Sequence, residues 1–239
     1  MNIGKLRLGS TPRIAAVILD GKDKKSISKA KKDGADLLEL RIDCFKRQDT
    51  DYIRKIIKDV RAENLPVIAT IRSKAEGGRR NLKDAERLRI FKAIIPLVDA
   101  IDIELSSKRI LKDVIKEAHR FKKRVIVSYH DFRNTPAEGQ LSAIIKNSRD
   151  AGGDIVKIAA FAKDKRDITR LASLTASHND IITIAMGRLG VVSRLFFPML
   201  GSLLTYCSVT KSSAPGQMPL KTTALLFKKL RMNTKILCH

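Results

Sequence analysis

Short runs of β-branched and other apolar residues recur along the chain, and segments with the apolar spacing of helices separate them. Eight such runs predict strands, at residues 14–19, 37–42, 67–72, 100–105, 124–129, 154–160, 181–186 and 204–209. The interval between successive runs leaves room for two loops and one helix. The pattern therefore predicts eight alternating strand and helix units.

The intervening segments carry helical signals. Two apolar stripes predict buried helix faces: Ile53, Ile56, Ile57 and Val60 in one helix, and Ile110, Val114, Ala118 and Phe121 in another. Gly34 predicts the end of the first helix, because glycine readily adopts the left-handed conformation found there. Thr135, Pro136 and Glu138 together predict a capped helix start.

Eight such units in one chain of 239 residues favour a closed parallel (β/α)8 barrel, the TIM-barrel fold. The alternative is an open, doubly wound sheet, which usually carries a glycine-rich phosphate-binding loop after its first strand. Residues 19–23 do not form that motif. We expect one domain over residues 1–239, with an N-terminal extension at 1–13 that forms a short hairpin closing the barrel bottom. A loose tail is expected at 232–239.

The composition adds a strong positive charge to this picture. Lysine and arginine outnumber acidic residues by 48 to 25, a formal net charge of +23, and no acidic residue follows Asp180. Such a field attracts anions, either nucleic acid or a small acidic metabolite, although a plain solvated surface also explains it. Neither an RNA-binding aromatic motif nor a zinc finger accompanies the charge, so nonspecific nucleic-acid contact is possible but is not the expected function.

Other sequence features narrow the class of protein. No apolar stretch is long enough to span a membrane, and residues 1–10 lack the apolar core of a signal peptide. The three cysteines are widely spaced and form neither a disulfide framework nor a zinc pattern. No metal-ligand spacing occurs. We therefore expect a cytoplasmic protein with no metal.

The active sites of such barrels lie at the carboxyl ends of the strands, where this chain places many polar residues. Lys157 is the most informative, because strand alternation puts it on one face with Ile155 and Ala159, pointing into the barrel. A buried lysine whose pKa is lowered can attack a ketone or aldehyde and form a Schiff base. Alternatively, it is a structural lysine paired with Glu39, Asp102 or Glu104.

Three further strand ends support a site. His130 ends the strand beside Lys157, within reach of chemistry on a carbon attached to that lysine. Glu39, Arg41 and Asp43 alternate along one strand and are expected to face inward, where they orient a hydroxylated substrate. Arg72 ends an apolar run, and an arginine that faces inward there is expected to bind a carboxylate or a hydroxyl group. The segment 212–217 is either a plain loop or a lid over the substrate.

These elements together resemble the type I 3-dehydroquinate dehydratases, the Schiff-base enzymes of the shikimate pathway, which leads to chorismate and the aromatic amino acids. The resemblance spans residues 39–217, in the family's order, through six short segments: Glu39–Asp43, Ile71–Gly78, Ser128–Phe132, Val156–Ala159, Met186–Gly187 and Ser213–Gln217. It implies a TIM barrel, a homodimer and a lyase that reversibly dehydrates 3-dehydroquinate, a small anionic substrate, to 3-dehydroshikimate. No cofactor is implied.

The resemblance also implies roles for individual residues. Lys157 forms the imine with the substrate ketone, His130 is the general acid and base, and Glu76 lies beside that histidine. Matching substrate-binding positions are Glu39, Arg41, Arg72, Met186, Arg194, Ser213 and Gln217, of which Arg194 holds the substrate carboxylate. Two alternatives remain at this point: another Schiff-base barrel enzyme, such as an aldolase, and a basic nucleic-acid-binding protein on an inactive barrel.

Overall fold

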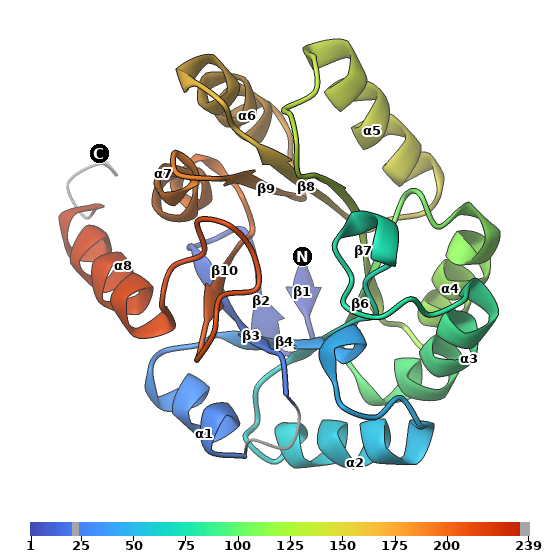
Figure 1. Ribbon diagram of the computed structural model, residues 1–239. Helices are drawn as coiled ribbons and strands as arrows, with labels where there is room; N and C mark the ends of the chain where they lie inside the picture. Colours follow the sequence, from blue (N-terminus) through green and yellow to red (C-terminus); the bar gives the residue numbers. More distant parts are fainter. Residues whose placement is uncertain (21–23, 235–239) are drawn as a thin grey trace.

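The computed structural model describes residues 1–20 and 24–234, which form a barrel of eight parallel strands surrounded by helices (Figure 1). The strands are β3 (Arg13–Ile18), β4 (Leu37–Arg41), β5 (Val67–Thr70), β6 (Ala100–Glu104), β7 (Arg124–Asp131), β8 (Ile155–Phe161), β9 (Ile181–Met186) and β10 (Leu204–Ser208). The hydrogen-bonded ladder runs from β10 through β3 and then in sequence order to β9. The predicted TIM barrel is confirmed.

The barrel closes between β9 and β10. There the Leu203 amide donates to the Ile181 carbonyl oxygen at 2.9 Å, and the Thr183 amide donates to Ser202 Oγ at 3.1 Å. The helices outside the barrel are α1 (Lys24–Lys32), α2 (Thr50–Arg61), α3 (Asp84–Ile94), α4 (Lys108–Arg120), α5 (Glu138–Asp150), α6 (Lys165–Ser177), α7 (Gly190–Phe196) and α8 (Leu220–Thr234).

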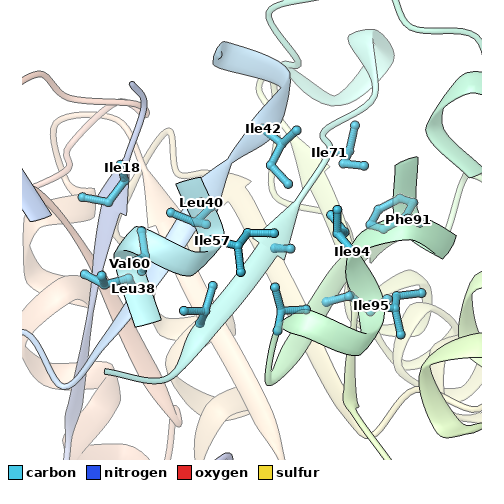
Figure 2. Packing of buried hydrophobic residues seen from close by; sticks show 14 of the residues in the cluster. Ile18, Leu38, Leu40, Ile42, Ile57, Val60, Ile71, Phe91, Ile94 and Ile95 are labelled. Carbon is cyan, nitrogen blue, oxygen red and sulfur yellow. The ribbon is translucent and has the colours of Figure 1, made fainter. Parts of the chain in front are cut away.

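Side-chain alternation divides the apolar residues of the strands into two sets. Leu38 and Leu40 point outward and pack beneath Ile57 and Val60 of α2, and Phe91 and Ile94 of α3 lie farther along the same apolar layer, near Ile71 (Figure 2). Leu37 and its counterparts on the other strands point inward and fill the lower half of the barrel: Ala15, Ile68, Ala100, Ile126, Ile155, Ile182 and Leu204. The inward-facing charged side chains therefore lie in the upper half, toward the carboxyl ends of the strands.

The residues before β3 form a small antiparallel hairpin, in which β1 (Asn2–Ile3) pairs with β2 (Leu6–Arg7). Ile3 and Leu8 are buried against the inward-facing apolar residues of the barrel. The hairpin thus covers the amino-terminal end of the barrel, opposite the polar end.

Three details of the helices differ from the sequence prediction. Phe121 was predicted to be buried but is 37% exposed, because α4 ends at Arg120 and Lys122 turns the chain with a φ of 54°. The helix predicted to start near Thr135 begins at Glu138, since the Thr135 hydroxyl instead donates to the Phe161 carbonyl oxygen. Helix α8 reaches Thr234, so residues 232–234 are helical, and the rest of the predicted tail, 235–239, lies outside the described residues.

The contrast between two phenylalanines gives a stability prediction. Phe91 is fully buried between α3 and the strands, so Phe91→Ala should lower the free energy of unfolding by about 3–5 kcal/mol. Phe121→Ala, the matched control on the surface, should cost less than about 1 kcal/mol. Urea unfolding followed by circular dichroism measures both, and equal losses would contradict the assignment of the core.

Candidate active site

The carboxyl ends of the strands enclose a pocket of about 110 Å³. The pocket brings together the catalytic and substrate-binding side chains that the family resemblance implies: Glu39, Arg41, Arg72, Glu76, His130, Lys157, Met186, Arg194, Ser213 and Gln217. They come from strands, from the loops that follow them and from helix α7. Residues far apart in the sequence meet here because parallel strands all end at the same rim.

Lys157 lies at the floor of this pocket. Its side chain is only 4% exposed, and Nζ donates to Asp102 Oδ2 at 2.9 Å and lies 3.6 Å from Glu39 Oε1. On another side, Nζ sits 4.0 Å from the centre of the Tyr206 ring. Without substrate, Lys157 is therefore an ion-paired lysine, which was one of the two predictions for this residue. Its partners are Glu39 and Asp102 but not Glu104. Lys157 also lines the pocket, so its amine faces the space that a ligand would occupy.

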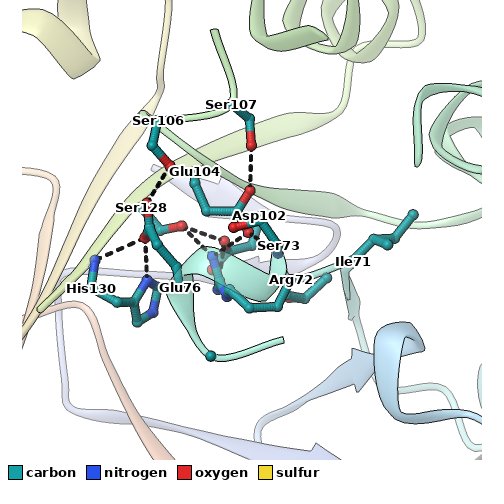
Figure 3. Close-up of polar contacts among 12 residues, drawn as sticks. Ile71, Arg72, Ser73, Glu76, Asp102, Glu104, Ser106, Ser107, Ser128 and His130 are labelled. Atoms are coloured by element: carbon teal, nitrogen blue, oxygen red, sulfur yellow. Dashed lines mark hydrogen bonds and ion pairs between the residues drawn. The ribbon is translucent and has the colours of Figure 1, made fainter. Parts of the chain in front are cut away.

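A buried network of charges supports the lysine (Figure 3). Arg72 lies between Asp102, with 2.8 Å from Nη2 to Oδ1, and Glu104, with 3.1 Å from Nη1 to Oε1. Arg72 also donates to Ser128 Oγ at 2.6 Å, and that hydroxyl donates to Asp102 Oδ1 at 2.7 Å. Behind Glu104, the fully buried Arg87 of α3 donates to Oε2. Each charge of this network thus has at least one opposite charge in contact, which offsets the cost of burying it.

Ion pairing keeps the two carboxylates of this network ionised. Burial opposes the charge on Asp102, but Arg72 and Lys157 outweigh burial and hold the pKa of Asp102 well below its usual range. Burial likewise opposes the charge on Glu104, and Arg72 and Arg87 hold the pKa of Glu104 below its usual value. The floor of the pocket is therefore a fixed array of charges at neutral pH.

Glu76 and His130 form a second pair, in which burial favours the neutral form of each group. His130 Nδ1 lies 3.0 Å from Glu76 Oε2, which also accepts a hydrogen bond from the His130 amide at 2.9 Å. Ser106 Oγ donates to the other Glu76 oxygen. Burial raises the pKa of Glu76 to about 7. Burial, reinforced by Arg72 and Lys157, lowers the pKa of His130 well below its usual value, so the imidazole is neutral at neutral pH.

Arg194 brings a positive charge into the pocket and forms no ion pair with a carboxylate among residues 1–20 and 24–234. It lies on α7, is 3% exposed, and its Nε and Nη2 have no hydrogen-bond partner in the described part of the chain. Burial lowers the pKa of Arg194 to about 10, so it stays protonated at neutral pH. A buried cation with two unused donors favours an anionic ligand.

The remaining predicted residues lie at the rim. Strand β4 ends at Arg41. The prediction that Asp43 lies on the same strand face as Glu39 and Arg41 is wrong, because Asp43 lies in a 3-10 turn, η1 (Ile42–Cys44). Arg41 and Asp43 still pair through two contacts of 2.9 Å. Gln217 Oε1 accepts from the Ser213 amide at 2.6 Å and from its hydroxyl at 3.0 Å, which ties the loop into a compact turn. At Gly216, with a φ of 75°, a Cβ atom would lie 2.6 Å from the Gly187 carbonyl oxygen, so this loop packs tightly against the end of β9.

Tyr206 is a pocket residue that the sequence argument did not single out. It lies on β10, is 4% exposed, and its hydroxyl has no hydrogen-bond partner in the part of the chain the structure covers. Alternation along the predicted strand 204–209 offered a signal, because it places Tyr206 on the inner face with Leu204. Phe132 was also missed; its ring stacks near His130, with 6.4 Å between ring centres.

The fold and the site define a (β/α)8-barrel enzyme whose pocket combines a buried lysine, a neutral histidine and a buried arginine with unused donors. The sequence model of the family described as Type I 3-dehydroquinase matches residues 19–233, and the chain belongs to this family.

Individual relatives agree with this assignment. The chain is 42% identical to a 3-dehydroquinate dehydratase of Methanosarcina barkeri, over 91% of this chain and 94% of the relative, and 39% identical to that of Thermodesulfovibrio yellowstonii, over 92% and 96%. The crystal structure of the Aquifex aeolicus 3-dehydroquinate dehydratase superposes with a TM-score of 0.84 at 37% identity, covering 92% of this chain and 99% of that chain. The type I enzyme of Clostridium difficile, solved with covalently modified comenic acid, gives 0.89 at 28% identity, covering 98% of both.

Among residues 1–20 and 24–234, no helix is both long and apolar enough to cross a membrane. Within the same ranges, no group of three or more histidine, cysteine or acidic side chains is arranged to hold a metal ion.

The raised pKa of Glu76 predicts a specific pH dependence of stability. Because its folded value of about 7 lies above the value of about 4.3 in an unfolded chain, the folded state holds this proton more tightly between those pH values. The contribution of Glu76 to stability therefore falls as pH rises from 4 to 7. The free energy of unfolding of Glu76→Gln, taken relative to that of the unmodified protein, should therefore rise by about 3 kcal/mol from pH 4 to pH 8.

Unfolding free energies measured by urea titration across this range test the effect. Glu138→Gln, at an exposed position on α5, is the matched control and should leave the pH profile unchanged. Parallel profiles for the unmodified protein and Glu76→Gln would show that Glu76 has an ordinary pKa.

Proposed function

We propose that this enzyme reversibly dehydrates 3-dehydroquinate to 3-dehydroshikimate through an imine on Lys157, with His130 as the general acid and base. The observation that carries the proposal is the placement of the Lys157 amine at the floor of a pocket that also contains a neutral imidazole and a buried arginine with unused donors. The names of the relatives supply the substrate.

Imine formation follows from the surroundings of Lys157. The ammonium group first gives up a proton to a base in the pocket, and the free amine then attacks the C3 ketone of the substrate. Loss of water from the resulting carbinolamine yields a cationic iminium. Asp102, Glu39 and the face of the Tyr206 ring surround Nζ, so they stabilise the positive charge of the iminium as they stabilise the ammonium.

Elimination then requires one group that first removes a proton and then delivers one. The iminium acidifies the adjacent C2–H bond because the electron pair released there is delocalised onto the imine nitrogen. Nδ1 of His130 is held by Glu76, which leaves Nε2 to take the C2 proton and later to protonate the departing C1 hydroxyl as water. Hydrolysis of the product imine restores the lysine. The low pKa of His130 keeps it in the basic form needed for the first transfer.

The remaining pocket residues are proposed to bind the substrate. Arg194 supplies unused donors for the substrate carboxylate. The charged and polar side chains of Glu39, Arg41, Arg72, Ser213 and Gln217 face the ring hydroxyls, and Met186 supplies an apolar wall. Neither an aldolase nor a nucleic-acid-binding barrel accounts for the family match, so no second function is proposed.

A homodimer stays a prediction, and a second copy would find an exposed apolar face on α7 and the adjoining 3-10 turn η4 (Phe197–Leu200), formed by Val191, Val192, Phe196, Met199 and Leu200. The absence of a cofactor and the cytoplasmic location also stay predictions.

Trapping the imine tests the mechanism. Incubation with 3-dehydroquinate and borohydride should add one ligand-sized mass, confined by peptide mapping to Lys157. Lys157→Ala should lose the adduct and lower kcat by roughly a thousandfold or more. Lys163→Ala, an exposed lysine beyond the end of β8, is the control and should retain both. A Lys157→Ala variant with undiminished activity would overturn the Schiff-base mechanism.

The role of Arg194 is tested separately through substrate binding. Arg194→Gln removes the charge but keeps a hydrogen-bond donor, so KM for 3-dehydroquinate should rise roughly 10- to 100-fold while kcat falls less. Arg188→Gln, the exposed neighbour before α7, should leave KM within about twofold. An unchanged KM in Arg194→Gln would place the carboxylate elsewhere in the pocket.

A further inference from the structure

A second cavity, of about 500 Å³, opens at the same end of the barrel as the substrate pocket. Val17 of β3 lines both. The walls come from the ends of β3 and β10 and from the segments that follow β4 and β5. No part of the proposed dehydration uses this cavity.

The lining of the second cavity is strongly basic. Lys46, Arg79, Arg80 and Lys211 line it, and Asp20 is the one acidic side chain among the lining residues. None of the four cations forms an ion pair with a carboxylate within the described ranges of the chain. Like charges gathered around a concavity repel one another and focus a positive potential into it, and a bound anion relieves that repulsion.

Hydrogen bonds hold the Arg80 guanidinium and the backbone that carries Arg79, while the side chains of Lys46, Arg79 and Lys211 are exposed. Arg80 donates from Nε to the Phe45 carbonyl oxygen at 3.2 Å and from Nη2 to that of Lys46 at 2.8 Å. The Arg79 amide donates to Asp43 Oδ2 at 3.1 Å. Before them, a Cβ atom on Gly78 would lie 2.2 Å from the Arg72 carbonyl oxygen, so only glycine permits this close approach. A site fixed before binding loses less entropy when a ligand arrives.

From this geometry we propose that the second cavity binds the phosphate group of a small phosphorylated metabolite. The Arg79 guanidinium can match two phosphate oxygens with paired hydrogen bonds, Arg80 retains Nη1 as a donor beside the two carbonyl oxygens it binds, and two lysines add charge. The volume lies in the range of about 300–1,000 Å³ that is typical of small-molecule sites. It therefore leaves room for the organic part of a phosphate ester beside the phosphate itself.

The same two segments form walls of the substrate pocket. Arg79 and Arg80 follow Glu76 and Gly77 in one loop, while Lys211 precedes Ser213 and Gln217 in another. A phosphate ester held between Arg80 and Lys211 joins these loops and restricts their opening. The expected consequence is tighter substrate binding, with KM lowered at least about fivefold, an effect that rests on the proposed dehydration. The binding of the ester does not rest on it.

Calorimetric titration with glycerol 3-phosphate at constant ionic strength tests the site. The unmodified protein should bind the ester, and the double variant Arg79→Gln/Arg80→Gln should bind it at least about tenfold more weakly. The control Arg89→Gln/Arg109→Gln removes the same charge from exposed positions on α3 and α4 and should change affinity less than twofold. Arg194→Gln should also retain binding, because it belongs to the other pocket.

Four outcomes would overturn the proposal. They are no binding to the unmodified protein at millimolar ester, equal weakening in the control, loss of binding in Arg194→Gln, and affinity for inorganic phosphate equal to that for the ester. Thermal unfolding of each variant confirms that it is folded. An inactive enzyme that still binds the ester through Arg79 and Arg80 would contradict only the proposed dehydration.

Discussion

The contact between Arg72 and Asp102 is the interaction on which the rest of the site depends. Asp102 is completely buried, and without a cation beside it the ionised carboxylate would be too costly to keep in the barrel. Once ionised, it anchors the Lys157 ammonium at 2.9 Å and thereby fixes the reactive nitrogen at the floor of the pocket. Ser128 hydrogen bonds to both of these groups. Three side chains therefore hold the geometry: Arg72 just after β5, Asp102 on β6 and Ser128 on β7.

The architecture allows such a charged interior because it separates polar from apolar layers. The hairpin and the inward-facing apolar residues fill the amino-terminal half of the barrel, and the helices cover the outside of the strands. These two apolar regions supply the buried surface that stabilises the fold. The carboxyl-terminal layer is then free to carry Arg72, Asp102, Glu104 and Lys157, whose desolvation a smaller or less layered domain could not offset.

Much of the fold was predictable because strands buried on both faces leave nearly continuous apolar runs, as in residues 14–19 and 181–186. The direction of Lys157 followed from alternation alone. The choice among Glu39, Asp102 and Glu104 as its partner did not follow, because β6 and β8 are separated by β7. In the two ladders Lys157 is level with Ser128 and Glu104, yet its amine reaches Asp102, two residues earlier on β6. The errors at Phe121 and Thr135 arose where the chain leaves a helix or where a distant carbonyl captures a capping hydroxyl, and neither event is encoded locally.

The site holds carboxylates in two opposite states within one small volume, and this separation defines the chemistry it can support. Asp102 and Glu104 are kept ionised by arginines that touch them, so they act as fixed charges that do not exchange protons at neutral pH. Glu76 lacks such a contact, and burial raises its pKa to about 7. It is therefore poised to share a proton with His130, which it holds at 3.0 Å. Two carboxylates with divergent pKa values in one pocket are characteristic of sites that combine electrostatic stabilisation with proton transfer. A reaction that needs a stabilised cation on Lys157 and a mobile proton beside it requires both states at once.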